Sequence, residues 1–266
     1  MPIKIPPSIN KFLDNRLAKP EMCLRARGLY MLMSKDTPLI SIVIPAYNES
    51  ENIVRSLLSL CANRTAKSVE IIVVDNNSSD DTQSLVEACG VRCITEGMQG
   101  ITHARNAGLK AAQGDYVLNA DADAVYPEDW IEEMTRPLMN NMDVAITYGL
   151  FSFIPIADTG RMTYFIYEYL SSASRFFNKI FKDEAVNVYG FNSGFRREQG
   201  IQVDGFNHPP GTNEDGYLAF KLRAKGFGKL YCVKRKEALV WTTDRRIQID
   251  GGIYKASILR LKRLLG

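Results

Sequence analysis

An α/β fold, with a mainly parallel Rossmann-like sheet and helices on both faces, is predicted for this chain by three observations. Short apolar runs typical of buried strands recur between residues 39 and 119, segments of helical periodicity separate them, and polar residues follow each run. Strands that alternate with helices pair in parallel, because each helix returns the chain to the start of the sheet. With 266 residues, 45% of them hydrophobic and 24% charged, the chain suffices for one large domain or two small ones.

Four strands and three helices are expected in the first half. The expected strands are Leu39–Ile44, Val69–Val74, Val91–Ile94 and Asp115–Asn119. The expected helices are 50–61, capped by Asn48 or Ser50; a second that ends at Ala88 and is capped by Asp80 or Asp81; and Thr102–Ala112.

The pattern changes after about residue 145. Nine aromatic residues lie within 151–181, and we expect them to divide between core packing and a cleft for a second substrate. A helix at 215–224 and strands near 230–233 and 238–241 follow.

Both ends of the chain are basic, although the net charge is only +3. Residues 1–37 are predicted to be a basic appendage punctuated by prolines, and residues 38–245 the main domain, with halves 38–145 and 146–245. Residues 246–266 are predicted to form a basic amphipathic helix, with apolar residues at 254, 258, 261 and 265. Such a helix can lie on an anionic membrane surface or pack against a partner, and the sequence does not indicate an oligomeric state.

The sequence lacks an apolar leader and any stretch near the length of a membrane span. Its five cysteines are an odd number without metal-type spacing, which favours reduced thiols. We therefore expect a cytoplasmic protein, with peripheral attachment to the inner face of the membrane as an option. No nucleic-acid partner is expected.

Polar residues follow each strand of the first half. They are Pro45-Ala-Tyr-Asn-Glu49, Asp75-Asn-Asn-Ser-Ser-Asp80, Gly97 to Gly108 and Asp121-Ala-Asp123. In a parallel sheet these segments meet along one edge, where α/β proteins bind ligands.

The chemistry of these groups suits a nucleoside diphosphate. Tyr47 can stack on a base, Asp75 can accept a hydrogen bond from a ring N–H, and Arg105 beside a helix N-terminus can face phosphate. Asp121 and Asp123 supply the hard oxygen ligands that suit Mg²⁺ or Mn²⁺. Each group alone has a local alternative, such as turn packing, helix capping or a surface ion pair, and their joint placement favours a site.

These four motifs, in this order, resemble the inverting glycosyltransferases of family 2, which have a GT-A fold; the resemblance covers about residues 39–245. It implies that 38–145 is the nucleotide-sugar-binding half and 146–245 the acceptor-binding half. By the resemblance, Asp123 is the main metal ligand and Asp121 serves the sugar side of the donor. The nucleotide-sugar site implied in this way comprises Pro45, Ala46, Tyr47, Glu49, Asp75, Asn77, Gly100, Arg105, Asn106, Asp121 and Ala122.

The second half supplies the remaining roles implied by the resemblance. Asp215 corresponds to the catalytic base, with Glu214 beside it; the alternative is a capping box in which Asn213 is the cap. The acceptor and donor-sugar region comprises Asn192, Ser193, Gly194 and Trp241, and the diphosphate is faced by Arg245 or Arg246.

The expected function is transfer of a sugar from a nucleotide-sugar, with UDP favoured and GDP or dTDP open, to a hydroxyl of a glycan or lipid-linked acceptor in cell-envelope polysaccharide synthesis. The Gln-x-x-Arg-Trp motif of processive relatives is absent, which favours single addition. A nucleotidyltransferase is disfavoured because residues 45–52 contain neither Gly nor Lys, and a dehydrogenase because no Gly-x-Gly-x-x-Gly follows the first strand. The remaining alternative is a non-catalytic protein that binds a sugar nucleotide or acts as a scaffold at a membrane surface.

Overall fold

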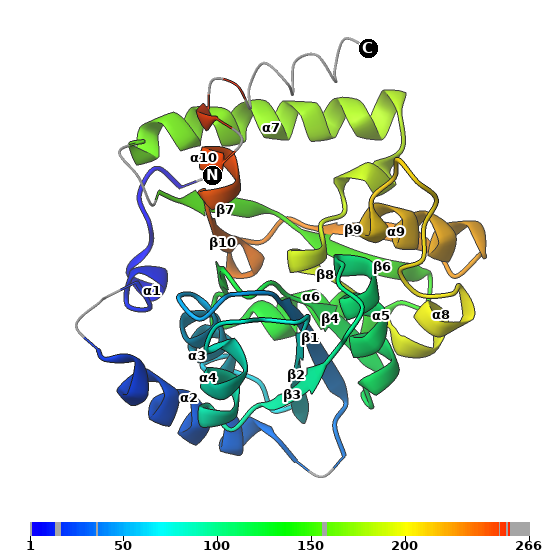
Figure 1. Ribbon diagram of the computed structural model, residues 1–266. Helices are drawn as coiled ribbons and strands as arrows, with labels where there is room; N and C mark the ends of the chain where they lie inside the picture. The colour runs from blue at the N-terminus through cyan, green and yellow to red at the C-terminus, as the bar shows by residue number, and fades with distance from the viewer. Residues whose placement is uncertain are drawn as a thin grey trace.

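A seven-stranded sheet forms the centre of the part of the chain described by the computed structural model, which covers residues 2–13, 17–35, 37–155, 159–249, 251–253 and 255 (Figure 1). The strand order is β3-β2-β1-β4-β8-β6-β9. The strands are β1 (Ile40–Ala46), β2 (Val69–Asp75), β3 (Arg92–Thr95), β4 (Tyr116–Asn119), β6 (Val144–Gly149), β8 (Ser193–Arg196) and β9 (Lys229–Val233).

Parallel pairing dominates this sheet, as predicted. Strand β1 pairs in parallel with β2 and β4, β2 with β3, and β6 with β9. Only β8, among the described strands of the sheet, runs antiparallel to its neighbours β4 and β6. The carboxyl ends of β1, β2 and β4 therefore lie together, which is the edge where the sequence places the polar motifs.

Helices cover both faces of the sheet (Figure 1). The α-helices are α1 (Pro7–Asn10), α2 (Lys19–Met33), α3 (Ile53–Cys61), α4 (Thr82–Ala88), α5 (Ile101–Ala111), α6 (Trp130–Asn140), α7 (Arg161–Phe181), α8 (Arg197–Gln202), α9 (Glu214–Ala224) and α10 (Arg245–Ile249). Short 3-10 turns are η1 (Glu184–Asn187), η2 (Gly190–Asn192) and η3 (Lys236–Ala238).

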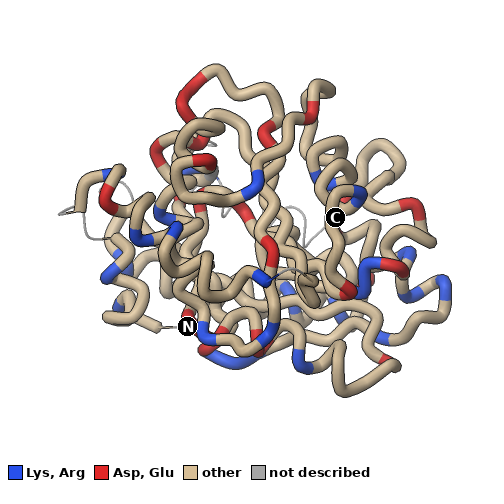
Figure 2. The backbone as a smooth tube through the Cα atoms, turned by 90° about the horizontal axis from the view of Figure 1, so that it is seen from below, with Lys and Arg blue, Asp and Glu red and all other residues tan. Residues whose placement is uncertain are grey.

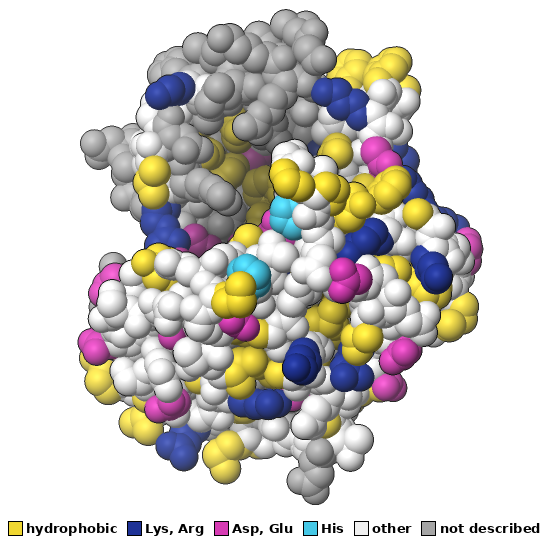
Figure 3. Space-filling model, turned by 45° about the vertical axis from the view of Figure 1, so that its right-hand side comes forward, with side chains coloured by type: hydrophobic (Ala, Val, Ile, Leu, Met, Phe, Trp, Pro, Cys, Tyr) yellow, Lys and Arg dark blue, Asp and Glu magenta, His cyan; other side chains and the backbone are white. Residues whose placement is uncertain are grey.

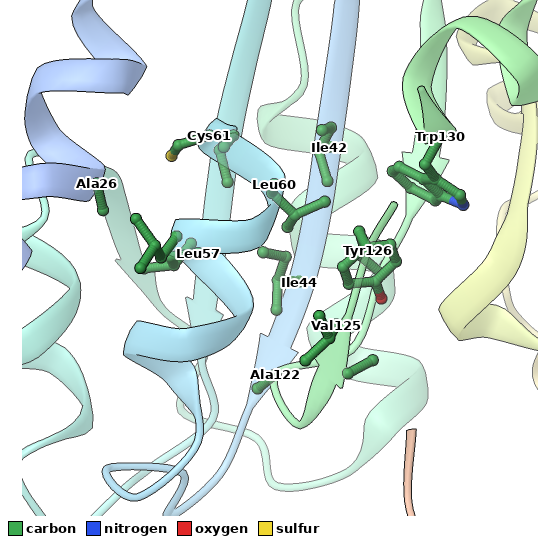
Figure 4. Close-up of a cluster of buried hydrophobic side chains, with 14 of the residues drawn as sticks. Ala26, Ile42, Ile44, Leu57, Leu60, Cys61, Ala122, Val125, Tyr126 and Trp130 are labelled. Atoms are coloured by element: carbon green, nitrogen blue, oxygen red, sulfur yellow. The ribbon is translucent and has the colours of Figure 1, made fainter. Parts of the chain in front are cut away.

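Alternate side chains of β1 enter two separate cores. Ile42 and Ile44 join the core beneath α2, α3, α4 and α6, which Figure 4 shows with Leu57, Tyr126 and other buried side chains. Val43 points to the opposite face and packs in the core formed with α5 and α9. This alternation follows from the two-residue period of a strand, and burial on both faces explains why β1 is an almost unbroken apolar run.

The N-terminal segment, expected to be an appendage, packs on the main domain. Cys23, Ala26 and Met33 of α2 are buried in the same core as α3 and α4. Tyr30 is also buried there, and its hydroxyl accepts a hydrogen bond of 3.1 Å from the Ile71 N–H. Helix α2 therefore forms an outer layer over α3 and α4, because its apolar residues recur at helical spacing.

The second half differs most from the expectation. Helices α6 and α7 and strands β6, β7 (Phe151–Ile154) and β8 were not predicted, and much of the aromatic run 151–181 forms the single long helix α7. A small second sheet has the order β5-β10-β7, with β5 at Ala124–Val125 and β10 at Val240–Thr243. Phe151, Phe153 and Tyr164 pack between this sheet and α7.

Several element boundaries also shift. Helix α3 begins at Ile53 after Asn52, so capping by Asn48 or Ser50 was wrong; Asn48 instead has φ of 54° in the preceding turn. Strand β10 begins at Val240 rather than near 238, because residues 236–238 form η3. The strand expected to end at Ile44 continues through Pro45 to Ala46.

The remaining expectations concern the termini and the surface. Most of the expected C-terminal helix, including positions 254, 258, 261 and 265, lies outside the described residues. Within the described part, no helix combines the length and apolarity needed to cross a membrane. The five cysteines are free, and basic and acidic residues intermingle on the face seen from below (Figure 2).

Candidate functional site

A cleft of about 570 Å³ opens at the carboxyl ends of β1 and β4. Nine of the expected site residues line it, namely Pro45, Ala46, Tyr47, Glu49, Gly100, Asp121, Ala122, Asp123 and Arg245. Sequence reasoning missed six further lining residues, which are Asn48, Asn76, Gln99, Ile101, Ala104 and Ile249. The cleft thus joins the ends of strands of the first half to α10 at the end of the chain.

The turns after β1 and β2 are tied together by hydrogen bonds. The Asn48 side chain accepts from the Ser79 N–H at 2.8 Å, and the Asn48 N–H donates to Ser78 Oγ at 2.9 Å. The Ser50 N–H donates to Asp80 at 3.0 Å. These bonds hold the turn that carries Tyr47, whose ring is 51% exposed at the cleft and available for stacking.

Asp75 ends β2 with one carboxylate oxygen unused. Its Oδ2 accepts from the Ser78 N–H at 3.2 Å, whereas Oδ1 is buried and has no hydrogen-bond partner in the part of the chain that the structure describes. A buried acceptor of this kind costs free energy unless a donor reaches it. Asp75 does not itself line the cleft, but its strand partner Ala46 and the next residue Asn76 do, so the unused oxygen is an acceptor adjacent to cleft residues.

Asn76 holds the segment 96–100 in place, a role that the sequence analysis did not assign. Its amide nitrogen donates to the carbonyls of Glu96 and Met98 at 2.9 and 2.8 Å, and its oxygen accepts from the Gly100 N–H at 2.7 Å. Gly100 has φ of 140°, a conformation that favours glycine. Asn77, expected in the site, reaches only the Gly97 carbonyl and does not line the cleft.

The acidic segment after β4 is held by three hydroxyl groups. The Asp121 N–H donates to Tyr126 Oη at 2.8 Å, and Ser56 Oγ donates to the Asp121 carbonyl at 3.0 Å. Thr243 Oγ1 donates to Asp123 Oδ2 at 3.2 Å. These contacts place both carboxylates of the Asp-x-Asp motif at the cleft.

Negative charge is concentrated around Asp123. Burial, together with Asp121 and Glu49, raises the pKa of the Asp123 carboxyl to about 6. Arg245 counters part of this charge: its Nη2 lies 3.4 Å from Asp123 Oδ2, and its guanidinium forms a two-pronged ion pair with Glu49. The only cation lining the cleft, among the described residues, is thus engaged with its acids.

The donor set fits a divalent cation held jointly with phosphate. Asp123 and Asp121 offer hard oxygen ligands, and the raised pKa of Asp123 reflects burial first and the nearby charges of Asp121 and Glu49 second. Within the described residues no three His, Cys, Asp or Glu side chains form a complete cage. Mg²⁺ is commonly held by one or two carboxylates, with substrate phosphates supplying further ligands, so a partial cage suits it.

A buried arginine links this segment to α9. Arg105, 2% exposed, donates from Nη2 to Asp121 Oδ1 at 2.9 Å. Its Nε forms an ion pair with Asp215 Oδ1 at 3.6 Å, too long for a hydrogen bond. Burial, with Glu214 and Asp121, raises the pKa of the Asp215 carboxyl to about 7, although Arg105 opposes the shift.

Asp215 lies in the first turn of α9. The Asn213 side chain caps the helix by accepting from the Gly216 N–H at 2.7 Å. The helix cap that was the alternative to a catalytic role for Asp215 therefore exists in the structure, beside Asp215. Gly190 packs against Asp215: a Cβ there would lie 2.3 Å from Arg105 Nη2 and 2.4 Å from both Asp215 oxygens. The absence of a side chain at this position leaves room for the ion pair.

Five other expected site residues have structural contacts instead. Asn192 is 1% exposed and bonds Trp130, Leu150 and Ala238, while Ser193 accepts from Asn119. Gly194 lies in β8 within the sheet, and Trp241 is 1% exposed. Among the described residues, these four are therefore packed in the core or the sheet and do not line the cleft.

The fifth, Asn106, does not line the cleft and bonds the segment after α8. Its oxygen accepts from the Phe206 N–H at 2.8 Å, and its nitrogen donates to Asn207. The side chain of Arg246 lies outside what the structure describes.

Curated relatives match part of the chain. An uncharacterized glycosyltransferase of Haemophilus influenzae is 31% identical over 122 residues, which cover 44% of this chain and 48% of that protein. The putative glycosyltransferase EpsH of Bacillus subtilis is 29% identical over 131 residues, covering 47% and 37%. The chain therefore spans less than half the length of these two relatives.

Solved structures share the fold. A mannosyltransferase from Pyrobaculum calidifontis, in complex with GDP-Man and Mn²⁺, has a TM-score of 0.56 at 19% identity, covering 88% of this chain and 67% of that one. Glucosyl-3-phosphoglycerate synthase from Mycobacterium tuberculosis, with Mn²⁺, UDP and phosphoglyceric acid, has a TM-score of 0.56 at 21% identity, covering 92% and 82%. These neighbours are GT-A glycosyltransferases, so the predicted fold class is confirmed.

The family assignment comes from the sequence model described as Glycosyl transferase family 2, which matches residues 41–199. That range contains the strand-end motifs and the cleft acids, and it covers more than half of the 266 residues. The chain therefore belongs to glycosyl transferase family 2.

Proposed function

We propose that this protein transfers a sugar from a nucleoside diphosphate sugar to a hydroxyl group, with inversion at the anomeric carbon. The observation that carries the proposal is the linked set Asp215–Arg105–Asp121. It connects a carboxylate of raised pKa to the acidic motif of the cleft through one buried guanidinium. Membership of family 2 and the match to GT-A folds support the same reaction class.

The donor nucleoside is assigned to the cleft between Tyr47 and Asp75. The exposed Tyr47 ring stacks on the base, and the unused Oδ1 of Asp75 accepts from a ring N–H. Uracil offers such a donor at N3, which favours a UDP-sugar. Support also comes from neighbours solved with UDP or UDP-GlcNAc, whereas another contains GDP-Man, so the screen below includes three bases.

Asp123, aided by Asp121, is assigned to hold Mn²⁺ or Mg²⁺ with the donor diphosphate. The bound cation supplies charge stabilisation for the departing phosphate oxygens. Arg245 exchanges its contacts with Glu49 and Asp123 for the diphosphate, where a guanidinium binds phosphate oxygens well. Arg246, next in the chain, is proposed as a further diphosphate contact.

Asp215 is assigned as the general base. The acceptor hydroxyl gives its proton to the Asp215 carboxylate while the oxygen attacks the anomeric carbon, and the bond from that carbon to the diphosphate oxygen breaks. A pKa of about 7 suits this step, because the carboxylate then holds the proton effectively near neutral pH. Arg105 keeps Asp215 in place, and Glu214 lies beside it at the start of α9.

The acceptor is assigned to the 146–245 half as a glycan or a lipid-linked sugar, with one sugar added per encounter. The basic termini fit peripheral attachment to the inner face of the cytoplasmic membrane, in the synthesis of an envelope polysaccharide. Asn192, Ser193, Gly194 and Trp241 support this half from the core.

The test is a screen of UDP-, GDP- and dTDP-sugars with Mn²⁺ or Mg²⁺ for binding and slow hydrolysis. We expect one donor to bind with metal, Asp123→Ala to lose that binding, and Asp215→Asn to bind without turnover. Asp143→Asn, an exposed acid remote from the cleft, is the matched control and should behave as wild type. Absence of donor binding with either metal would overturn the proposal, and binding without turnover in wild type would favour the scaffold alternative.

A further inference from the structure

Helix α7 carries large apolar side chains outward and polar ones inward, the reverse of an ordinary surface helix. Its buried residues are Tyr164, Glu168, Ser171 and Ser174. Its exposed apolar residues, each at least 49% exposed, are Met162, Ile166, Tyr169, Leu170, Phe176, Phe177, Ile180 and Phe181. We call this set the outer face of α7. A contiguous apolar surface of this kind marks an interaction or membrane site.

The orientation of α7 is fixed by its buried polar face. Glu168 accepts from the Phe153 N–H and from Ser152 Oγ, each at 2.8 Å, and forms an ion pair with Arg161 at 2.8 Å. Rotating the helix to bury its apolar face would expose these groups and break the pairing of buried charges. The outward apolar face is therefore a stable feature of the fold.

Positively charged side chains beside the outer face of α7 indicate what kind of surface it binds. Lys179 and Lys182 are exposed near the end of α7, and Lys179 pairs with Glu184 while remaining 58% exposed. In Figure 3 hydrophobic and basic side chains gather at the upper right, over the end of α7. Apolar side chains flanked by cations are suited to anionic lipid headgroups.

Gln248 and Ile253, near the end of the described part of the chain, lie close to the same helix. Gln248 of α10 donates to Tyr164 Oη at 3.2 Å, and Ile253 packs against the Phe151–Tyr164 cluster. From residue 251 onward the sequence has four basic residues and no acid. A symmetric contact with a second copy would bring these basic segments together, whereas an anionic surface attracts them.

Helix α7 is also connected to the catalytic side of the molecule. Asn178 of α7 donates to Asn187 Oδ1, and the Asn187 side chain donates to the Arg175 carbonyl, each at 3.0 Å. Three residues after Asn187, Gly190 packs against Asp215. The segment 184–190 therefore joins helix α7 to the assigned base.

We infer that the outer face of α7 docks this protein on an anionic membrane surface, so that its acceptor is a membrane-borne glycan. The evidence for docking is the exposed apolar face and the charges beside it. The class of acceptor rests on the proposed function. Docking through α7 would bring the half of the molecule that carries Asp215 to the lipid surface, because α7 and Asp215 are joined through residues 184–190.

The test is co-sedimentation of the full chain, without nucleotide, with vesicles of phosphatidylcholine alone or mixed with phosphatidylglycerol. The test variant is Ile166→Gln/Tyr169→Gln/Phe176→Gln, with side chains 55%, 70% and 62% exposed. The matched control is Leu24→Gln/Met31→Gln/Leu32→Gln on α2, 69%, 72% and 78% exposed, at the other end of the molecule in Figure 1. We expect salt-sensitive binding to anionic vesicles that falls about tenfold or more in the α7 variant only.

Three outcomes would overturn the inference. They are unchanged vesicle binding by the α7 variant, an equal loss in the α2 variant, and a wild-type dimer that the α7 variant separates while neither binds vesicles. A chain shortened to end at residue 255 should retain part of its binding; complete loss there, with α7 unimportant, assigns docking to the tail alone. Donor binding measured in solution separates this result from failure of the proposed function, because α7 lies outside the donor cleft.

Discussion

Arg105 Nε lies 3.6 Å from Asp215 Oδ1, while Nη2 of the same guanidinium donates to Asp121. One buried side chain thus contacts the assigned base and the acidic motif of the cleft. Both Arg105 Nε and Asp215 Oδ1 are buried without a hydrogen-bond partner among the described residues. Asp215 is therefore a desolvated carboxylate whose proton affinity depends on the charge of Arg105.

The first prediction concerns pH. Asp215 has a raised pKa of about 7, so it is protonated and inactive as a base at lower pH. We expect kcat/KM of wild type to rise with pH and level off above about 7. In Arg105→Gln the lowering effect of the guanidinium is lost, so the rising limb should move to higher pH.

The measurement is the pH profile of kcat/KM for wild type, Arg105→Gln and the conservative Arg105→Lys, which should restore part of the shift. Circular dichroism checks that the variants fold, because removing one partner of a buried ion pair is destabilising. A loss of activity that is equal at every pH would assign Arg105 a purely structural role.

The second prediction tests the space left by Gly190. A methyl group there would fall 2.3–2.4 Å from Arg105 and Asp215, so Gly190→Ala must displace the ion pair. We expect kcat to fall about 100-fold, since a displacement near 1 Å of a reacting group costs this much. Gly160→Ala is the control, because a Cβ at Gly160 meets nothing within 4 Å. Equal activities of the two variants would show that the geometry at Gly190 is unimportant.

The third prediction concerns Arg245, which contacts Asp123, the main acid assigned to the cation, and forms an ion pair with Glu49. Without nucleotide, Arg245→Gln should bind Mn²⁺ about fivefold more tightly, because a competing charge near Asp123 is removed. Turnover should fall, because the diphosphate loses a cationic contact. Electron paramagnetic resonance of free Mn²⁺ measures the first effect. Arg235→Gln, whose guanidinium pairs with Glu133 and Glu237, is the control, and weaker Mn²⁺ binding by Arg245→Gln would contradict the assignment.

The fourth prediction concerns Asn76, which makes three hydrogen bonds to residues 96–100. Asn76→Ala removes three partly buried hydrogen bonds, each worth about 0.5–1.5 kcal/mol. We expect donor affinity to fall about 10- to 100-fold, as the wall of the cleft loosens. Isothermal titration with the identified donor measures the effect. Gln83→Ala, which removes one exposed bond to Glu87, should not change the affinity, and unaltered binding by Asn76→Ala would refute the role.

The sequence by itself determined the parallel core and most of the cleft. Strands β1, β2 and β4 are apolar runs because both faces are buried, and the chain direction places the residues after them at one edge. Tyr47, Asp75, Asp121 and Asp123 could therefore be placed from local patterns alone. The family match supports the same motifs.

Only the tertiary structure decided which face each later element buries. Residues 161–181 of the aromatic run form a helix whose apolar side is exposed, because Glu168 and Arg161 pair on its inner side. Periodicity in the sequence shows that a helix has an apolar stripe, but not whether that stripe faces the core. Asn192 and Trp241 were placed near a ligand by resemblance, whereas in the structure Asn192 bonds buried partners and Trp241 is 1% exposed. Gly190 and Asn76 act through neighbours distant in sequence, and such contacts exist only once the chain has folded.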